Sequence, residues 1–508
     1  MGATEYIIVL SIYFLIIFII CYYANKRTQD LSDYVLGHRS LSPPIVALGA
    51  GASDMSGWLL LALPGAVFIH GLNQIWMPVG LLIGAYLNWR LVSPRLRAYT
   101  EVANNALTIP AYFDNRFHDK TRILRIVTAG AVLIFFTVYV AAGFVSGALL
   151  FESAFNLSYH NALWISAVFV IAYTAFGGFL AISWIDFFQG SLMFFALIIT
   201  PLYALHHMGG WHVTLHKLLP FGTTYFQPFH HISMVAFLSL VGWGLGYFGQ
   251  PHILVRFMAI RSVKGLLSAR RICMTWMFIS LLGAIMTGIV GHAYFNHGLL
   301  RPEGDFIQLS EQLFVPWIAG ILLAALLSAI MSTSSAQLLI SSSALVEDVY
   351  HRFLRRNKAS QAELVLMSRI TVAIIALISL VLAYNPKSTI LGLVQYAWGG
   401  LGSAFGPVII ISLFWRRITR LGAITGIVVG AMTAIIWKSV LSHYGGIFAM
   451  YEVIPGFIVA SMAIVVVSLL DKEPSQQIQN EFEKAKGMAS IVKPDSSDED
   501  SDVVGMPG

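Results

Sequence analysis

Long apolar stretches, separated by short polar segments, run along almost the whole chain. A helix needs about 20 mostly apolar residues to cross a membrane, and stretches of about this length recur thirteen times. The predicted spans lie at about 5–25, 43–70, 75–97, 124–152, 160–178, 182–206, 234–256, 272–297, 313–345, 370–385, 390–415, 421–440 and 451–471. This pattern predicts an all-α integral membrane protein with about thirteen transmembrane helices, in which residues 1–471 form a single membrane domain.

The composition excludes an ordinary soluble domain. Hydrophobic residues make up 57% of the 508 residues and charged residues only 11%, whereas soluble domains carry about 25% charged residues. The net charge of +6 does not indicate a nucleic-acid partner, because the basic residues lie at the predicted membrane edges. Cys21 and Cys273 fall in or beside apolar segments and predict neither a disulfide framework nor a thiolate metal site.

The basic residues also predict the orientation of the chain. The first span has no Lys or Arg before it, and Lys26 and Arg27 follow it, so we expect an anchor with its N-terminus outside rather than a cleavable signal. If the crossings alternate from there, all but four of the 31 Lys and Arg residues fall on the inner side, Arg256 among them. Basic residues stay on the cytoplasmic side during insertion. The four outer ones are Lys217, Arg301, Lys387 and Lys438, and the C-terminus is expected inside.

The polarity of the chain changes abruptly after residue 471. The segment "DKEPSQQIQNEFEKAKG" is polar and predicts a short helix. The segment "KPDSSDEDSDVVGMPG" that ends the chain is acidic and rich in serine, a composition typical of disorder. Residues 472–508 are therefore expected to form a cytoplasmic tail.

Two predicted spans contain glycine-rich interruptions. The first is "GAGASDMSG" in the second span, and the other runs from Gly242 to Pro251 and His252 in the seventh. Glycine costs about 1 kcal/mol and proline about 3 kcal/mol inside a helix, so both segments predict helices broken near the membrane midplane. Transporters hold polar cargo at such breaks. Glycine also permits close helix packing, an alternative that suits residues 422–430 better than the second span.

The two breaks lie five spans apart. Spans two to six and spans seven to eleven then form two halves that each open with a broken helix. Because five is odd, the second half enters the membrane from the opposite side. The pattern therefore predicts an inverted repeat over about 41–206 and 234–415.

Asp54 lies inside the first break. A carboxylate at mid-membrane costs at least ~2.5–3.5 kcal/mol, and it is tolerated where it faces a cavity, a cation or free backbone N–H groups. Asp54 could cap the restarted half-helix, place negative potential beside a cation, or do both, and we favour both.

The ninth span offers oxygen atoms for such a cation. Ala329, Ser332 and Thr333 have the spacing i, i+3, i+4 and share one helix face. Together with the carbonyls of Ala52 and Met55 they provide five uncharged oxygens, which suit a monovalent ion that must leave again. The alternative is that both hydroxyls bond back to their own helix.

Several long motifs occur in the same order as in a known family. The runs "AGASDMSGWLL", "FGGFLAISW", "GWGLGYFGQPHIL", "AIMSTSSAQLL" and "RITRLGAITG" resemble the sodium:solute symporter family, and most strongly its bacterial members that take up proline. The resemblance extends from about Tyr34 to Leu470. It implies the leucine-transporter fold, an inverted five-plus-five repeat with one extra helix before it and two after.

The resemblance also implies a function and a set of site residues. The implied function is sodium-coupled uptake of L-proline by alternating access across the bacterial cytoplasmic (inner) membrane, with sodium as the co-transported ion, no cofactor and no enzymatic activity. Another solute of the family, such as pantothenate or a different amino or organic acid, is the alternative. The implied sodium site is Ala52, Met55, Ala329, Ser332 and Thr333, with Asp54 and Ser56 beside it. The implied substrate site is Trp58, Tyr139, Trp243, Tyr247 and Pro251, and Arg39 and Asp186 match positions linked to coupling.

The remaining signals favour no other function class. Six histidines crowd the loop after the sixth span, but a polar outer loop explains them better than a zinc site: they are His206, His207, His212, His216, His230 and His231. No nucleotide-binding or hydrolase motif is present. A sensor would need an appended signalling domain, and a channel would need a continuous pore. We expect a transporter in the lipid bilayer that functions as a monomer.

Overall fold

The computed structural model describes residues 3–26, 39–106, 108–219, 222–230, 232–295, 298–299, 301–355, 358–385 and 389–490. Over these residues the chain is helical apart from turns and one isolated bridge. Ten of the helices described there are long and apolar enough to cross a membrane. Large hydrophobic side chains are exposed along them, as lipid-facing helices require.

A helix lies over each predicted span. The first part of the chain forms α1 (Ala3–Asn25), α3 (Pro43–Asp54), η2 (Trp58–Ala62), α4 (Leu63–His70), η3 (Gly71–Ile75), α5 (Trp76–Leu87), η4 (Asn88–Val92), α6 (Ser93–Val102), α7 (Ile109–Phe117), α8 (Ile123–Phe155), α9 (Tyr159–His207) and α10 (Trp211–Leu218). The second part forms η6 (Thr223–Phe226), α11 (Met234–Gly242), η7 (Trp243–Gly249), α12 (Pro251–Ala259), α13 (Gly265–Tyr294), η8 (Pro302–Gly304), α14 (Asp305–Leu313), α15 (Pro316–Ser343), η9 (Ala344–Leu354), α16 (Gln361–Leu382), α17 (Ile390–Phe414), α18 (Arg420–Ser439), η10 (Leu441–Tyr444), η11 (Gly446–Ala449), α19 (Val453–Leu470) and α20 (Gln476–Ser490).

Ten helices of the described residues, rather than thirteen, are long and apolar enough to count as spans. Some predicted spans are broken into short helices, and others are joined into one continuous helix. The pieces of the broken helices are short, and the run Trp58–Val102 is continuously helical over two predicted spans. In α9, Gly178 has φ 64° and ψ 175°, which interrupts the helix between the predicted spans 160–178 and 182–206. A positive φ of this kind favours glycine. The number and direction of the crossings stay predictions.

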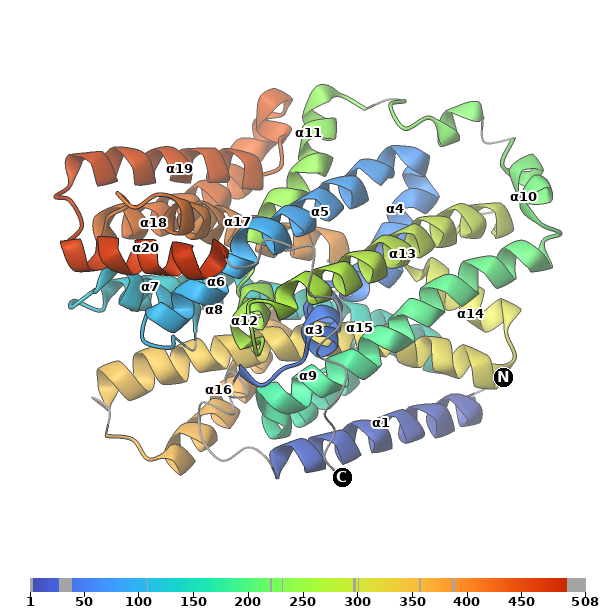
Figure 1. The fold of residues 1–508 in the computed structure, drawn as a ribbon. Coiled ribbons are helices and arrows are strands. Elements are labelled where there is room, and N and C mark those ends of the chain that lie inside the picture. The colour runs from blue at the N-terminus through green and yellow to red at the C-terminus, as the bar shows by residue number, and fades with distance from the viewer. Residues whose placement is uncertain are drawn as a thin grey trace, which may run out of the picture.

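The broken helix α3 and the long helix α15 lie at the centre of the molecule (Figure 1). Helix α15 is buried along almost its whole length, and it packs against α8 and α9 as well as α3. Helix α1 lies on one side against α9 and α15, and α18 and α19 pack on α17 on the other. One helix before the central bundle and two after it is the placement that the resemblance implies.

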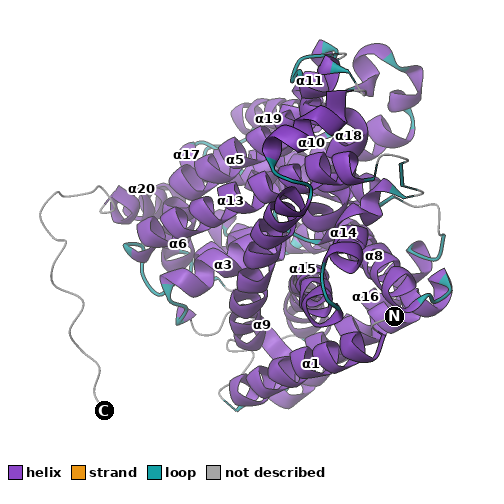
Figure 2. Ribbon diagram, turned by 90° about the vertical axis from the view of Figure 1, so that its right-hand side faces the viewer, coloured by secondary structure: helices purple, strands orange, loops and turns teal. Residues whose placement is uncertain are grey.

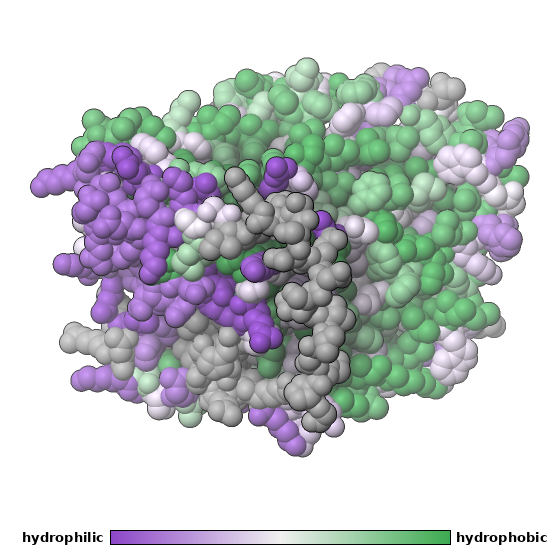
Figure 3. Space-filling model, viewed as in Figure 1, coloured by the Kyte–Doolittle hydropathy of each residue, from purple (hydrophilic) through white to green (hydrophobic). Residues whose placement is uncertain are grey.

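The two ends of the molecule differ in polarity. Hydrophilic side chains gather at the end that holds α6, α7 and α20 (Figure 3). The N-terminal end of α1, α10 and α14 lie at the opposite end (Figure 1). The helix predicted at the start of the tail is α20, which packs along α6 (Figure 2). The acidic segment predicted to be disordered lies outside the described residues.

At the hydrophilic end, Asp119 forms hydrogen bonds with residues that are far apart in the sequence. It accepts hydrogen bonds from the backbone N–H of Leu124, from Thr121, and from Arg420 at the start of α18 at 2.9 Å. Burial raises the pKa of Asp119, but these hydrogen bonds outweigh burial and hold the pKa below its usual range. The carboxylate thus caps α8 and anchors α18 at once.

Candidate functional site

The first predicted break is present. Helix α3 ends at Asp54, and its last backbone bond runs from Met55 N to Gly51 O at 2.9 Å. Met55 (φ −82°, ψ 77°) and Ser56 leave the helical path, and helical bonding resumes with Leu59 N to Ser56 O at 3.0 Å. The backbone is therefore irregular beside the central helix α15, as the small residues of this segment predict.

The second predicted break is a tight 3₁₀ segment followed by an extended residue. Helix α11 ends at Gly242, η7 follows, and Gln250 (φ −88°, ψ 105°) precedes Pro251 at the start of α12. Side chains satisfy the carbonyls that the break removes from helical bonding. The pairs are Asn88 to Tyr247 O at 3.0 Å, Gln250 to Gly246 O at 3.1 Å, and Trp398 to Trp243 O at 2.8 Å.

Four of the five predicted sodium-site residues meet between α3 and α15. Ser332 Oγ donates to the carbonyl of Ala52 at 2.8 Å and to that of Ala329 at 3.2 Å. Thr333 Oγ1 lies 3.4 Å from the same Ala52 carbonyl. The shortest of these contacts crosses between helices, so the hydroxyls do not only bond back to their own helix. Met55, the fifth residue, lies at the break itself.

Asp54 contacts the second break rather than capping the first. Its Oδ2 accepts a hydrogen bond from the Tyr247 hydroxyl, and its Oδ1 has no hydrogen-bond partner among the described residues. Ser56 Oγ, not Asp54, receives the N–H of Trp58, at 3.4 Å. The capping role considered for Asp54 is therefore wrong, and its carboxylate links the two broken helices instead.

The structure gathers only part of the predicted substrate site. Trp58 donates its indole N–H to the Asp54 carbonyl at 3.1 Å, Tyr139 lies beside Ser56 and Asp54, and Tyr247 bonds the Asp54 carboxylate. The other two predicted residues make different contacts. The Trp243 ring packs on Tyr451 with 5.1 Å between ring centroids, and Pro251 lines a separate cavity of about 10 Å³.

The two predicted coupling residues have different partners and do not contact each other. Arg39 Nη2 donates to the carbonyl of Ala106 at 3.1 Å. Burial and the charge of Arg97 lower the pKa of Arg39 to about 10, so it stays charged at neutral pH. Asp186 forms a buried ion pair with Arg256 at 2.5 Å.

Arg256 is the residue that sequence reasoning misplaced. The prediction put it in an inner loop, but it lies within α12, is only 2% exposed, and also donates to Ser183 at 2.5 Å. Charge counting assigns every Arg near a span end to a loop. Because a buried charge needs a partner, the acidic Asp186 in a neighbouring span was the available signal.

The ends of α3 and α12 nearest the hydrophilic face are joined. Leu41, just before α3, forms a bridge with Ile260, just after α12, and Arg261 N donates to Leu41 O at 3.2 Å. Arg97 on α6 donates to the carbonyl of Ile260 at 2.9 Å. These contacts join the segments before α3 and after α12 to α6.

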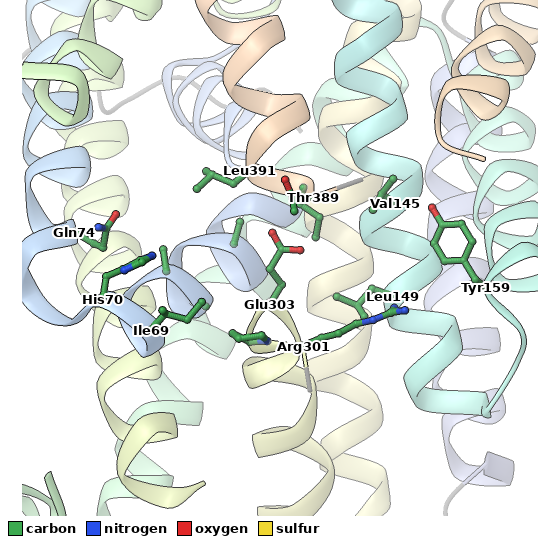
Figure 4. Close-up of a pocket in the computed structure, with 15 residues that line it drawn as sticks. Ile69, His70, Gln74, Val145, Leu149, Tyr159, Arg301, Glu303, Thr389 and Leu391 are labelled. Atoms are coloured by element: carbon green, nitrogen blue, oxygen red, sulfur yellow. The ribbon is translucent and has the colours of Figure 1, made fainter. Parts of the chain in front are cut away.

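A cavity of about 490 Å³ opens on the other side of the first break (Figure 4). It begins at Ala62, one turn beyond Trp58, and its polar lining includes His70, Gln74 and Arg301. Glu303 points into it and accepts backbone N–H groups at the start of α17; burial raises the pKa of Glu303 although these bonds oppose the shift. The cavity therefore lies beyond the first break in the chain, and no predicted site residue lines it.

The histidine-rich segment forms no metal centre that the described residues reveal. Among these residues, no group of three or more His, Cys, Asp or Glu side chains is placed to hold a metal ion. His231 lies outside the described residues.

Comparison with known sequences identifies close relatives. The model of the sodium:solute symporter family matches residues 34–430. A sodium/proline symporter of Escherichia coli (strain K12) is 50% identical over 490 residues, which cover 95% of this chain and 96% of that protein. A high-affinity proline transporter of Bacillus subtilis (strain 168) is 50% identical over 468 residues, 91% of this chain and 98% of that protein.

Comparison with solved structures gives the fold. A Na⁺-coupled sialic acid symporter, solved in a substrate-bound outward-open state, superposes with a TM-score of 0.78 over 93% of this chain and 99% of that one. The sequence identity is 17%, so this likeness concerns the fold alone. The helices, their breaks and their arrangement thus follow an architecture already seen in a sodium-coupled carrier.

Proposed function

The chain belongs to the sodium:solute symporter family, and from this premise we propose that it is a secondary active transporter that couples sodium entry to the uptake of L-proline. Relatives at 50% identity over nearly the full chain are named sodium/proline symporters and proline transporters. The proposed location is the bacterial cytoplasmic membrane, with thirteen crossings, the N-terminus outside, the tail inside, and a monomer as the working unit.

The observation that carries the proposal is the meeting of neutral oxygens from two separate segments. Ser332 Oγ lies within hydrogen-bond distance of Ala52 O and Ala329 O, and Thr333 Oγ1 lies 3.4 Å from Ala52 O, so oxygens of α3 and α15 meet. A sodium ion held there by these oxygens and by Met55 O takes the hard, uncharged ligands that it prefers. The nearby Asp54 carboxylate, which no basic side chain of the described residues pairs, adds a negative potential.

The proposed solute site adjoins the ion site. Proline carries a secondary ammonium, a carboxylate and an apolar ring. The faces of Trp58, Tyr139 and Tyr247 cover an apolar ring and attract a cation by ~0.5–2 kcal/mol. The Ser56 hydroxyl and the positive N-terminal end of the restarted helix attract the carboxylate without a positively charged side chain. Trp243 and Pro251, at the two ends of the second break, complete the proposed solute site.

Coupling follows from the shared break. Sodium binding fixes Ala52 and Met55, and the same backbone segment carries Ser56 and Trp58 toward the solute. Sodium and proline should therefore tighten each other's binding by the same factor. Alternating access then requires the bridge between Leu41 and Ile260 to open as the cavity beyond Ala62 closes.

Uptake into proteoliposomes tests this function. Radiolabelled proline should accumulate when an inward sodium gradient is imposed, and not when sodium is equal on both sides. A membrane potential, inside negative, should add ~2.3 kcal/mol per charge per 100 mV to the driving force. Pantothenate and other amino or organic acids serve as competitors, and sodium-driven uptake of one of these without uptake of proline would replace the proposed substrate.

A further inference from the structure

A second cavity, of about 600 Å³, lies at the hydrophilic end of the molecule. It shares no lining residue with the cavity described above. Helices α5, α6, α13 and α20 and the segment η4 surround it, with Phe414 at the end of α17. Every charged side chain that lines it is basic: Arg90, Arg95, Arg270 and Lys486.

Neutral groups hold the three arginines in place. Arg90 lies 3.4 Å from the Tyr86 hydroxyl, and Arg270 lies over the Tyr86 ring at 5.5 Å. Arg95 donates to the carbonyl of Leu413 at 2.8 Å and lies 3.9 Å above the ring of Phe414. These contacts orient the guanidinium groups, and among the described residues none of the three arginines forms an ion pair, although the charge of Glu483 acts on Arg95.

The tail helix brings the carboxylate of Glu483 close to Arg95 of the cavity. Glu483 pairs with Lys486 at 3.1 Å, and both side chains are about half exposed. An exposed pair of this kind contributes little. The cavity therefore keeps an excess of positive charge that a multivalent anion would neutralise.

Most of the remaining lining is hydrophobic and reaches the surface. Leu91 is 42% exposed, Phe414 40% and Tyr86 39%, although all three are large hydrophobic residues. Figure 3 shows hydrophilic side chains on the end that holds α6 and α20 and hydrophobic side chains beyond it. The cavity thus joins a cationic pocket to an apolar surface, which a soluble phosphate compound would leave uncovered.

We propose that this cavity binds the head group of an anionic phospholipid, with its phosphate among Arg90, Arg95, Arg270 and Lys486 and its acyl chains along Leu91 and Phe414. Basic pockets between helices at the cytoplasmic face are suited to such head groups. Lys486, Ala489 and Ser490 form one wall, so the lipid also fixes α20 against the membrane domain. The site is independent of the transported solute.

Basic residues at inner helix ends also serve membrane insertion, so the test must separate a specific site from general attraction. The full-length protein in detergent is titrated with cardiolipin and with phosphatidylglycerol and phosphatidylethanolamine of matched acyl chains. Bound lipids are counted by native mass spectrometry. The anionic lipids should bind at least tenfold more tightly than phosphatidylethanolamine, and glycerol phosphate, the head group alone, should not displace them.

Matched double variants locate the site. Arg90→Gln/Arg270→Gln should weaken binding of the anionic lipid about 30-fold, because it removes two of four charges. Lys264→Gln/Arg271→Gln removes two charges from the same end of α13 outside this cavity and should leave the tight site intact. Both variants must melt as the parent does in lipid-free detergent; if the arginine variant does not, Lys486→Gln on the exposed tail helix replaces it, with an expected loss of about fivefold.

Three results would overturn the proposal. If the two double variants lose the same affinity for the anionic lipid, general surface charge explains the binding and no specific site is needed. Displacement by glycerol phosphate at the lipid's own concentration would make the ligand a soluble phosphate compound. If the arginine variant and Lys486→Gln both bind the anionic lipid as tightly as the parent does, the lipid does not bind in this cavity.

Discussion

Asp54 and Asp186 are both buried carboxylates in apolar helices, yet their surroundings differ. Asp186 is neutralised by Arg256 at 2.5 Å, whereas Asp54 contacts only the neutral hydroxyl of Tyr247. Among the described residues no basic side chain pairs with Asp54, and this supports the proposal that its carboxylate lies beside a transported cation. The sequence predicted the position of Asp54 and the shared face of Ser332 and Thr333, because both follow from local spacing. It could not predict that Tyr247, 193 positions away, bonds Asp54, and only the need of a buried arginine for a carboxylate indicated the pair of Asp186 and Arg256, 70 positions apart.

Asp54→Asn keeps the size of the side chain and its hydrogen-bonding oxygen but removes the charge. We expect it to raise the sodium concentration for half-maximal proline uptake by about tenfold or more, the range that loss of a metal-site contact produces, with partial recovery at high sodium. Thr333→Ala should do the same. Sodium-dependent uptake in proteoliposomes measures both.

The matched control for this residue-scale test is Thr287→Ala. Thr287 is also buried, but its hydroxyl bonds only to Gly283 O of its own helix, at 2.8 Å. Its sodium dependence should equal that of the parent protein. If Asp54→Asn and Thr333→Ala both leave the sodium concentration for half-maximal uptake unchanged, sodium does not bind between α3 and α15.

At the scale of elements, the second break is held against α5 by backbone contacts. A Cβ atom built on Gly84 would lie 2.1 Å from the carbonyl oxygen of Gly244, and one on Gly244 would lie 2.2 Å from that of Gly80. The glycine clusters predicted both breaks because glycine is costly in a helix. The π-helical segments η2 and η4 were not predicted, since they depend on how neighbouring helices pack.

Gly84→Ala should therefore separate η7 from α5. Overpacking of this kind destabilises by about 1–3 kcal/mol, so we expect a lower melting temperature and weakened proline uptake. Gly130→Ala is the matched control in α8, where a Cβ would meet nothing within 4 Å; it should melt at the same temperature or slightly higher. Equal behaviour of the two variants would contradict the role given to this glycine contact.

For the whole molecule, the helices and the polar end follow from hydropathy and charge, and the orientation in the membrane is predicted from the basic residues. The structure places the start of α1 and α10 at one end and α20 at the other (Figure 1). Charge counting assigns the second end to the cytoplasm. Such counting misplaced Arg256, because an arginine of a buried ion pair cannot be distinguished in the sequence from an arginine in a loop.

Single-cysteine labelling checks this orientation. Both native cysteines are buried, so a membrane-impermeant maleimide should report mainly on introduced sites. In intact cells His212→Cys should react, and Lys264→Cys and Lys484→Cys should react only after permeabilisation. Reaction of Lys264→Cys in intact cells would overturn the predicted direction of the crossings.

The bond between Asp119 and Arg420 joins positions 301 residues apart, which constrains the order of assembly during synthesis. The chain emerges N-terminus first at ~5–20 residues per second. The carboxylate that caps α8 must therefore wait about 15 to 60 s for its arginine. Until then, the helices made earlier lie in the bilayer without the ion pair between Asp119 and Arg420. This pair forms only when α18 has been made. Nascent chains stopped just before α18 should therefore be the ones that quality-control proteases cut most readily at the junction of α7 and α8.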